Sequence, residues 1–294
     1  MERAIRHYFH QDIKEKTELE LSRKDAWMLV LSDGQKVVFR AHPDYTDAFE
    51  RERFFYESVN KSLGKICPDV YVVDGTCEYY DKPFQIAEYI EGETLESCLW
   101  DNPDYDEGKR RELYYKIGEL TARVNQIEID PNHPYVANRA PWEEYIADKI
   151  RFQLSRIVKN GLISTEEIDI ICGNLCRKRA ARALSFLHRD IRPLNMIYNN
   201  GTIFIIDAET CEFGDPLDEL AFINLEWNYW EMYDQLLAGY KSVLDIDTDS
   251  ELFCYYQLEQ VGEILDMHYN HDCGNSMTQF FLDLFNELKE KALH

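Results

Sequence analysis

The stretch from residue 188 to residue 207 constrains this chain more than any other part of it. It opens with the letters HRDIRPLN, whose first, third and eighth residues are His188, Asp190 and Asn195. Two short apolar runs, MIY and TIFII, follow on either side of Asn200-Gly201. Asn-Gly is favoured in the two-residue turns that close β-hairpins. The sequence therefore predicts a loop that leads directly into a hairpin.

The register of this hairpin follows from its turn. If the Asn-Gly pair forms the turn, Asn199 faces Thr202, and counting outward places Asn195 opposite Ile206. Asn195 and Asp207 then meet at the open end of the hairpin. An amide oxygen beside a carboxylate suits Mg²⁺, which takes few protein ligands and leaves positions for phosphate oxygens. We therefore expect a magnesium site made by Asn195 and Asp207.

Asp190 lies on the loop that leads into the hairpin. A carboxylate there can accept the proton of a substrate hydroxyl as that hydroxyl attacks a γ-phosphate. Arg192 follows two residues later, and it could either neutralise phosphate charge or pair with a nearby carboxylate. The alternative for the whole stretch is a surface hairpin with ordinary polar ends.

The stretch resembles the catalytic loop and metal-binding strand of the protein-kinase-like superfamily. The most similar branch is the aminoglycoside phosphotransferase and choline kinase group, whose loop typically reads H-G-D-x-x-P-x-N. Residues 214–221, GDPLDELA, resemble the G-D-P-x-x-D-L-A segment of that group. The resemblance implies that Asp190 is the catalytic base and that Asn195 and Asp207 hold Mg²⁺. It also implies that His188 and Asp218 support the loop.

The same group places a cation on the third strand and pairs it with a glutamate on the next helix. The matching residues are Arg40, in place of the usual lysine, and Glu52, with Glu50 and Glu57 as weaker alternatives. Arginine keeps the charge and can bind a carboxylate or phosphate in two places, but the two cations are not interchangeable.

Other nucleotide contacts are implied at two segments. One is the turn after the first strand, with Ser22 and Lys24, and the other is a hinge whose backbone at Glu88, Tyr89 and Ile90 would bind the purine of ATP or GTP. No G-x-G-x-x-G motif and no A-P-E segment are present. In the superfamily these absences favour a small-molecule substrate over a protein.

The acceptor is expected to be a cationic small molecule. Residues 207–294 carry three basic and twenty acidic side chains, and the whole chain has a net charge of −23. Carboxylates favour an aminoglycoside, whereas the aromatic rings of Trp227, Tyr229, Trp230 and Tyr233 could cage a choline- or ethanolamine-type ammonium. The alternatives are a solvated acidic face and an aromatic helix core. The candidate acceptor residues are Glu209, Glu212, Glu226, Trp230 and Glu231.

The expected architecture is α+β, a bilobal protein-kinase-like fold. A small antiparallel β-sheet lobe spans residues 1–90, and a larger helical lobe spans residues 91–294. We expect strands at 17–21, 27–31, 37–39, 70–73 and 84–90, and a helix at 47–63. Helices are further expected at 110–126, 142–158, 165–187, 217–243, 251–269 and 276–291, with a single β interruption at 195–207.

Residue spacing and composition argue against several other kinds of site and partner. The eight cysteines form no C-x-x-C pair, so we expect neither a zinc ribbon nor a thioredoxin-type motif, and all eight thiols reduced. His268, His271, Asp272 and Cys273 are spaced too loosely to favour a metal site over a surface loop. We expect a cytoplasmic protein with no membrane insertion and, because of its negative charge, no nucleic-acid partner. A catalytically silent kinase-fold binding protein remains the alternative of another class.

Overall fold

The computed structural model describes residues 1–19, 25–43, 46–130, 132–136, 140–178, 184–271, 273–274 and 276–294. The chain forms two compact units. The first comprises Met1–Glu107 together with Asp190–Cys211, and the second comprises Gly108–Arg189 together with Glu212–His294. The predicted division at residue 90 differs from these units, because the sheet-bearing unit continues to Glu107 and also takes in the hairpin.

The first unit contains the five-stranded antiparallel sheet that the sequence predicts, in the order β1-β2-β3-β5-β4. Its strands are β1 (Ile13–Glu18), β2 (Asp25–Leu31), β3 (Lys36–Ala41), β4 (Val70–Asp74) and β5 (Phe84–Glu88). The strand predicted at 17–21 corresponds to β1, which starts at Ile13 and ends at Glu18, and residues 20 and 21 of the predicted range lie outside the described residues. Gly34 has a φ of 93° in the turn between β2 and β3, a conformation that glycine adopts without strain.

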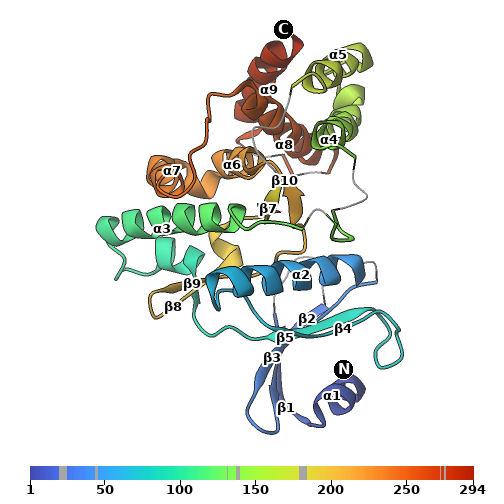
Figure 1. Ribbon diagram of the computed structural model, residues 1–294, viewed down its shortest axis with the longest axis vertical. Helices are drawn as coiled ribbons and strands as arrows, with labels where there is room; N and C mark the ends of the chain where they lie inside the picture. Colours follow the sequence, from blue (N-terminus) through green and yellow to red (C-terminus); the bar gives the residue numbers. More distant parts are fainter. Residues whose placement is uncertain are drawn as a thin grey trace. The chain divides into compact units, whose positions relative to one another are not determined.

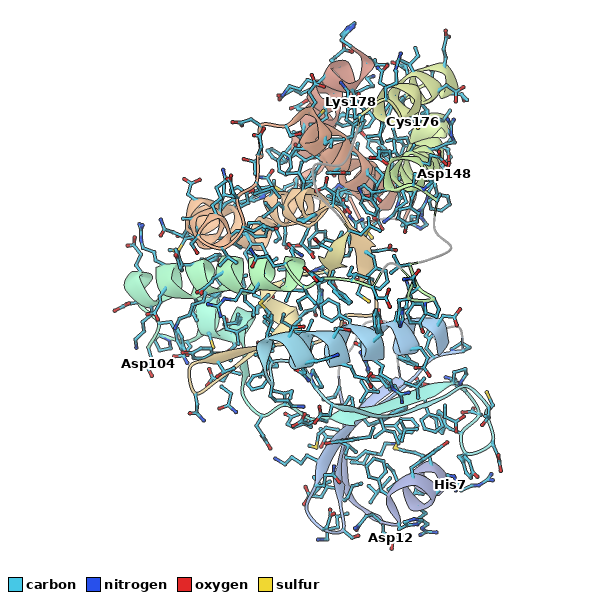
Figure 2. The ribbon with its side chains drawn as sticks, viewed as in Figure 1. His7, Asp12, Asp104, Asp148, Cys176 and Lys178 are labelled. Atoms are coloured by element: carbon cyan, nitrogen blue, oxygen red, sulfur yellow. The ribbon has the colours of Figure 1, made fainter. Side chains whose placement is uncertain are left out.

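The two faces of this sheet are covered by different helices (Figure 1). Helix α1 (Glu2–Phe9), which the sequence analysis did not predict, buries Ala4 and Ile5 against one face. Its His7 (Figure 2) stacks on the ring of Tyr79 at 4.0 Å between centroids. Helix α2 (Thr46–Leu63) packs against β4 and β5.

Alternation along the strands decides which side chains reach each face. Val37 and Phe39 of β3 belong to the core beneath α1. Because successive residues of a strand point to opposite faces, Arg40 points to the other face. The same alternation on β5 sends Phe84 to the α1 side and Gln85 to the side of Arg40.

The hairpin belongs to the first unit because of its backbone contacts there. It consists of β8 (Met196–Asn199) and β9 (Thr202–Ile205), and β8 also pairs with the short strand β6 (Glu93–Thr94). The Ile205 amide donates to the carbonyl of Ile66 at 2.8 Å. A π-helical turn at Ser97–Asp101 follows β6.

The second unit is mainly helical. Its helices are α3 (Glu107–Asn125), α4 (Trp142–Ile157), α5 (Thr165–Leu175), α6 (Pro216–Leu225), α7 (Tyr233–Lys241), α8 (Glu251–Asn270) and α9 (Thr278–Leu293), with 3₁₀ turns at Val158–Asn160 and Trp227–Met232. One apolar core joins α4, α5, α6, α8 and α9. Helices α3 and α7 approach so closely that a Cβ on Gly118 would lie 1.9 Å from the Leu236 carbonyl oxygen.

Two helix predictions in this unit are wrong. The helix predicted at 165–187 ends at Leu175, and Ser185–Leu187 forms strand β7, which pairs with β10 (Glu212–Gly214). The hairpin is therefore not the single β interruption. Phe186 and Phe213 lie opposite each other in this pair, with ring centroids 5.3 Å apart. Burial of this cross-strand pair favours the strand over a longer helix.

The helix predicted at 217–243 is interrupted after Leu225 by the 3₁₀ turn. The Trp230 indole donates to the Asn224 carbonyl at 3.0 Å, which satisfies a carbonyl at the end of α6. The eight cysteines are free thiols in the structure. No helix in the described part of the chain has the length and apolarity needed to cross a membrane.

Candidate active site

The hairpin has the register that its turn predicts. Asn199 pairs with Thr202 and Met196 with Ile205, and the Ile206 amide donates to the Asn195 carbonyl at 3.0 Å. Asn195 is therefore opposite Ile206 and next to the strand end that carries Asp207. The backbone places the two predicted metal ligands at the same end of one hairpin.

Asp190 contacts one of these two residues directly. The Asn195 amide nitrogen donates to Asp190 Oδ2 at 2.7 Å and to the Asp190 carbonyl at 3.0 Å. Since the nitrogen of the amide faces Asp190, its oxygen points away from Asp190. Arg192 Nε donates to Asp190 Oδ1 at 2.5 Å. Of the two alternatives for Arg192, pairing with a carboxylate is the one observed, and contact with phosphate stays a prediction.

Arg40 joins the sheet to the end of the hairpin. One guanidinium nitrogen pairs with Glu52 of α2, and the other donates to Asp207 Oδ1 at 2.9 Å. Burial lowers the pKa of Arg40, but Glu52, Tyr56, Asp207 and Glu209 together raise it above its usual value. The predicted Arg40–Glu52 ion pair is present, and Glu52 is fully buried.

Two residues of this network were not predicted. Gln85 of β5 accepts from Arg40 at 2.5 Å and donates to Glu52 at 2.9 Å. The Tyr56 hydroxyl donates to the other Glu52 oxygen at 2.8 Å, and burial raises the pKa of Tyr56 well above its usual value. Gln85 could have been found from the sequence, because it is a polar residue within the apolar run FQIA.

In the predicted purine-binding hinge, two backbone amides donate hydrogen bonds to other parts of the protein. The Glu88 amide donates to the Asp69 carbonyl at 2.8 Å, and the Tyr89 amide donates to the Lys36 carbonyl at 3.4 Å. No backbone acceptor for the Ile90 amide is seen among the described residues, and purine binding at this hinge stays a prediction. The predicted contacts Ser22 and Lys24 lie outside the described residues.

Gly92 follows this hinge and has a φ of 143°. A Cβ at this position would lie 2.5 Å from the Tyr198 carbonyl oxygen. Only glycine fits where the chain leaves the hinge and passes the hairpin.

The start of the predicted catalytic loop belongs to the second unit and is hydrogen-bonded there. Both oxygens of Glu219 accept backbone hydrogen bonds, from His188 at 2.6 Å and from Arg189 at 2.9 Å. Asp218, which was predicted to support the loop, pairs with the Arg189 side chain. Glu259 of α8 binds the same guanidinium at 3.1 Å. Sequence reasoning missed Glu219 and Glu259.

This part of the loop is buried and carries an unusual backbone conformation. His188 and Glu219 are at most 1% exposed, and Arg189 has a φ of 65° although it is not glycine. Burial raises the pKa of Glu219 to about 7, although the amides of His188 and Arg189 oppose this shift. Burial also raises the pKa of Asp218, while the Arg189 guanidinium opposes it.

The candidate acceptor residues lie on several elements. Glu209 follows the hairpin in the first unit and lies close enough to Arg40 to raise its pKa. In the second unit Glu212 accepts from the Tyr145 hydroxyl at 2.7 Å. Glu226 is the C-cap residue that follows α6, and Glu231 is exposed. The role of these residues in acceptor binding stays a prediction.

The aromatic residues after α6 serve mainly as core. Tyr229 is fully buried, and the half-buried Trp230 packs against Phe280 and Phe281 with ring centroids 5.0 and 6.3 Å apart. These contacts favour the helix-core alternative for both residues. The side chain of Trp227 lies outside what the structure describes.

The loose cluster near the end of α8 is only partly described. His268 Nδ1 lies 3.0 Å from the Thr278 hydroxyl, and Asp272 lies outside the described residues. No group of three or more His, Cys, Asp or Glu residues with metal-binding geometry occurs in the described part of the chain.

The model of the phosphotransferase enzyme family, known as APH, matches residues 22–247. No protein of curated function matches the chain by sequence.

Several solved structures share the fold along nearly the whole chain. A thermostable mutant of the aminoglycoside phosphotransferase APH(4)-Ia has a TM-score of 0.70 and 16% identity, over 99% of this chain and 98% of that one. The streptomycin–ATP complex of APH(2")-IIa gives 0.66 and 18%, over 99% and 97%. A candidate fructosamine-3-kinase from Haemophilus somnus 129PT gives 0.65 and 18%, over 100% and 96%. At these identities the likeness shows the fold.

Proposed function

Because the chain belongs to the phosphotransferase enzyme family, we propose that it transfers the γ-phosphoryl group of ATP or GTP to a hydroxyl of a cationic small molecule. The observation that carries the proposal is the convergence at the hairpin end. Asp190 is hydrogen-bonded to Asn195 at 2.7 Å, and Arg40 is bound to Asp207 at 2.9 Å. Side chains of a suitable kind thus stand where the resemblance implies a base, two metal ligands and a cation, which supports the proposal.

The donor set fits Mg²⁺. Asn195 turns its amide oxygen away from Asp190, and Asp207 keeps 27% of its side chain exposed while it binds Arg40. An amide oxygen and a carboxylate are hard oxygen ligands of the kind that Mg²⁺ takes, together with water and phosphate oxygens. When bound, the ion would neutralise charge on the transferring phosphate.

The residues of the chain supply the proton transfer and the orientation. In the proposed step the acceptor oxygen forms a bond to the γ-phosphorus, and the bond from that phosphorus to the bridging oxygen of the nucleoside diphosphate breaks. Asp190 accepts the proton of the hydroxyl. The contacts from Asn195 and Arg192 hold the Asp190 carboxylate in place for this role.

Charge supports a cationic acceptor. The net charge of −23, with three basic and twenty acidic side chains in residues 207–294, would concentrate cations near the protein. Aminoglycosides are our first choice, since two structures of the same fold contain them. The candidate fructosamine-3-kinases suggest amine-bearing sugars as a second class. The packing of Tyr229 and Trp230 weakens the case for a choline-type cage.

Catalytic silence is the competing function. It would fit a chain that had lost one of Asp190, Asn195 and Asp207, but this chain keeps all three. The replacement of the usual lysine by Arg40 is the feature in favour of silence.

A screen of acceptors decides between these functions. Purified protein would be incubated with Mg²⁺ and either ATP or GTP, together with aminoglycosides, amine-bearing sugars, choline, ethanolamine or macrolides. We expect a phosphorylated amine-bearing product by mass spectrometry. Nucleotide binding without any phosphorylated product would favour the silent protein.

A further inference from the structure

Gln85 is a buried amide beside Arg40 to which the proposed mechanism gives no role. It lies on β5 directly opposite Arg40 of β3, and opposite residues of an antiparallel pair put their side chains on the same face. Gln85 is fully buried and Arg40 is 7% exposed. A buried amide is costly unless its polar atoms are paired, so its partners indicate what it does.

Those partners are the two members of the central ion pair. Gln85 Oε1 accepts from Arg40 at 2.5 Å, and Gln85 Nε2 donates to Glu52 Oε2 at 2.9 Å. The same nitrogen lies 3.4 Å from the Phe49 carbonyl oxygen. Gln85 therefore bridges Arg40 and Glu52 and fixes both, in addition to their own ion pair.

The chemistry of arginine explains why an amide is useful here. A guanidinium carries five N–H donors in a rigid plane, whereas a lysine ammonium carries three on a freely rotating tip. Glu52 and Gln85 both bind Nη2 of Arg40, and Asp207 binds Nη1. The amide oxygen accepts an additional guanidinium hydrogen without adding another negative charge to this buried site.

We infer that Gln85 is a positioning residue that adapts this active site to arginine at position 40. By holding Nη2 together with Glu52, it directs the plane of the guanidinium so that Nη1 meets Asp207. Its effect on phosphoryl transfer passes through Arg40 to Asp207, the proposed metal ligand. The inference rests on the proposed function for its catalytic consequence, whereas the coupling between Gln85 and Arg40 can be measured separately.

A double-mutant cycle tests this coupling. Gln85→Met keeps a similar length and removes both hydrogen bonds, and Arg40→Lys removes the rigid plane. We expect Q85M to lower kcat at least about tenfold in the otherwise native protein but less than about threefold in the R40K background. The KM for the acceptor should stay unchanged. Equal losses in the two backgrounds would overturn the inference.

The control is another buried glutamine with an arginine partner. Gln153 of α4 is 7% exposed and accepts from Arg156 at 3.2 Å within the second unit. Gln153→Met should leave kcat within about twofold of the native value. A loss equal to that of Q85M would show that removal of any such amide is harmful.

Calorimetry of Mg²⁺-ATP binding to the native protein, Q85M, R40K and R40K/Q85M separates this inference from the proposed function. If the native protein phosphorylates no acceptor, the proposed function fails, but Q85M should still weaken Mg²⁺-ATP binding more with Arg40 than in R40K. Equal weakening would contradict the inference. If Q85M does not fold, R40K/Q85M should fold. Failure of both would assign Gln85 to general stability and overturn the inference.

Discussion

The molecule contains two buried arginines, each between two carboxylates, whose partners differ in their exposure to solvent. Arg40 and Arg189 have side chains that are only 8% and 7% exposed. Both carboxylates on Arg189, those of Asp218 and Glu259, are 1% exposed, whereas Asp207 on Arg40 is 27% exposed. We therefore expect the Arg40 network, which we call exchangeable, to be able to release Asp207 to a ligand from solvent, and the Arg189 network, which we call permanent, to keep both of its carboxylates.

The two networks also fix different parts of the chain. The Arg40 network orients side chains, including that of the proposed metal ligand. The Arg189 network fixes backbone, because Glu219 accepts the amide hydrogens of both His188 and Arg189. This backbone leads directly into Asp190. The permanent network thus holds the backbone that precedes Asp190, and the exchangeable network holds Asp207 at the end of the hairpin that follows.

We expect the largest effect from a variant that breaks the exchangeable network. Asp207→Ala should lower phosphoryl transfer about a thousandfold, the scale on which groups that stabilise transition-state charge act. It should lower the free energy of unfolding by no more than about 2 kcal/mol, because Arg40 keeps Glu52 and Gln85, and part of this loss comes from alanine at a φ of 58°. Steady-state kinetics and urea unfolding of this variant measure the two quantities. A large loss of stability would contradict the contrast between the networks.

The permanent network should respond in the opposite way. Asp218→Ala leaves a buried guanidinium with one carboxylate fewer, so we expect it to lower the free energy of unfolding by about 3–5 kcal/mol. Asp169→Ala is the matched control, because Asp169 pairs with Arg151 but is 61% exposed. It should cost less than about 1 kcal/mol. Similar values for the two variants in urea unfolding would refute the assignment.

A smaller effect depends on pH. Burial raises the pKa of Glu219 from 4.5 to about 7. The stability that follows from a raised carboxyl pKa is complete below the unfolded value and is lost as the pH rises through the folded value. We expect a loss on the order of 3 kcal/mol between about pH 4.5 and about pH 7, since one pKa unit is worth about 1.4 kcal/mol.

Glu219→Gln tests the origin of this loss, because its amide does not titrate. Urea unfolding between about pH 4.5 and about pH 8 should give a flatter profile for this variant than for the native protein. Parallel profiles for the two proteins would assign the pH dependence to other groups.

The position of Asn195 near Asp207 could be predicted from the sequence, because the register of a hairpin depends only on neighbouring residues. A two-residue turn and a period of two leave one register, and the observed Asn199–Thr202 pairing follows from them. The pairing of Arg40 with Glu52 was implied by family resemblance and is present. The strands of the sheet and most of the helices were also predicted from local patterns, because strands and helices each have a characteristic period of apolar residues.

Residues missed by the sequence analysis act through contacts between distant elements. Glu259 is 70 residues from Arg189 along the chain, and Gln85 is 45 residues from Arg40. No local pattern shows such pairings. The strand at 185–187 was missed because a short apolar run fits a helix and a strand equally well, and only its pairing with β10 decides between them.

The most direct test of the whole account is the turnover of Asp190→Asn with an acceptor found in the screen. The variant keeps the size of the side chain but cannot accept the hydroxyl proton. We predict that phosphoryl transfer falls by about a hundredfold to ten-thousandfold, while calorimetry shows Mg²⁺-ATP bound as in the native protein. Native turnover in this variant would contradict the assignment of the loop and hairpin as the site of phosphoryl transfer.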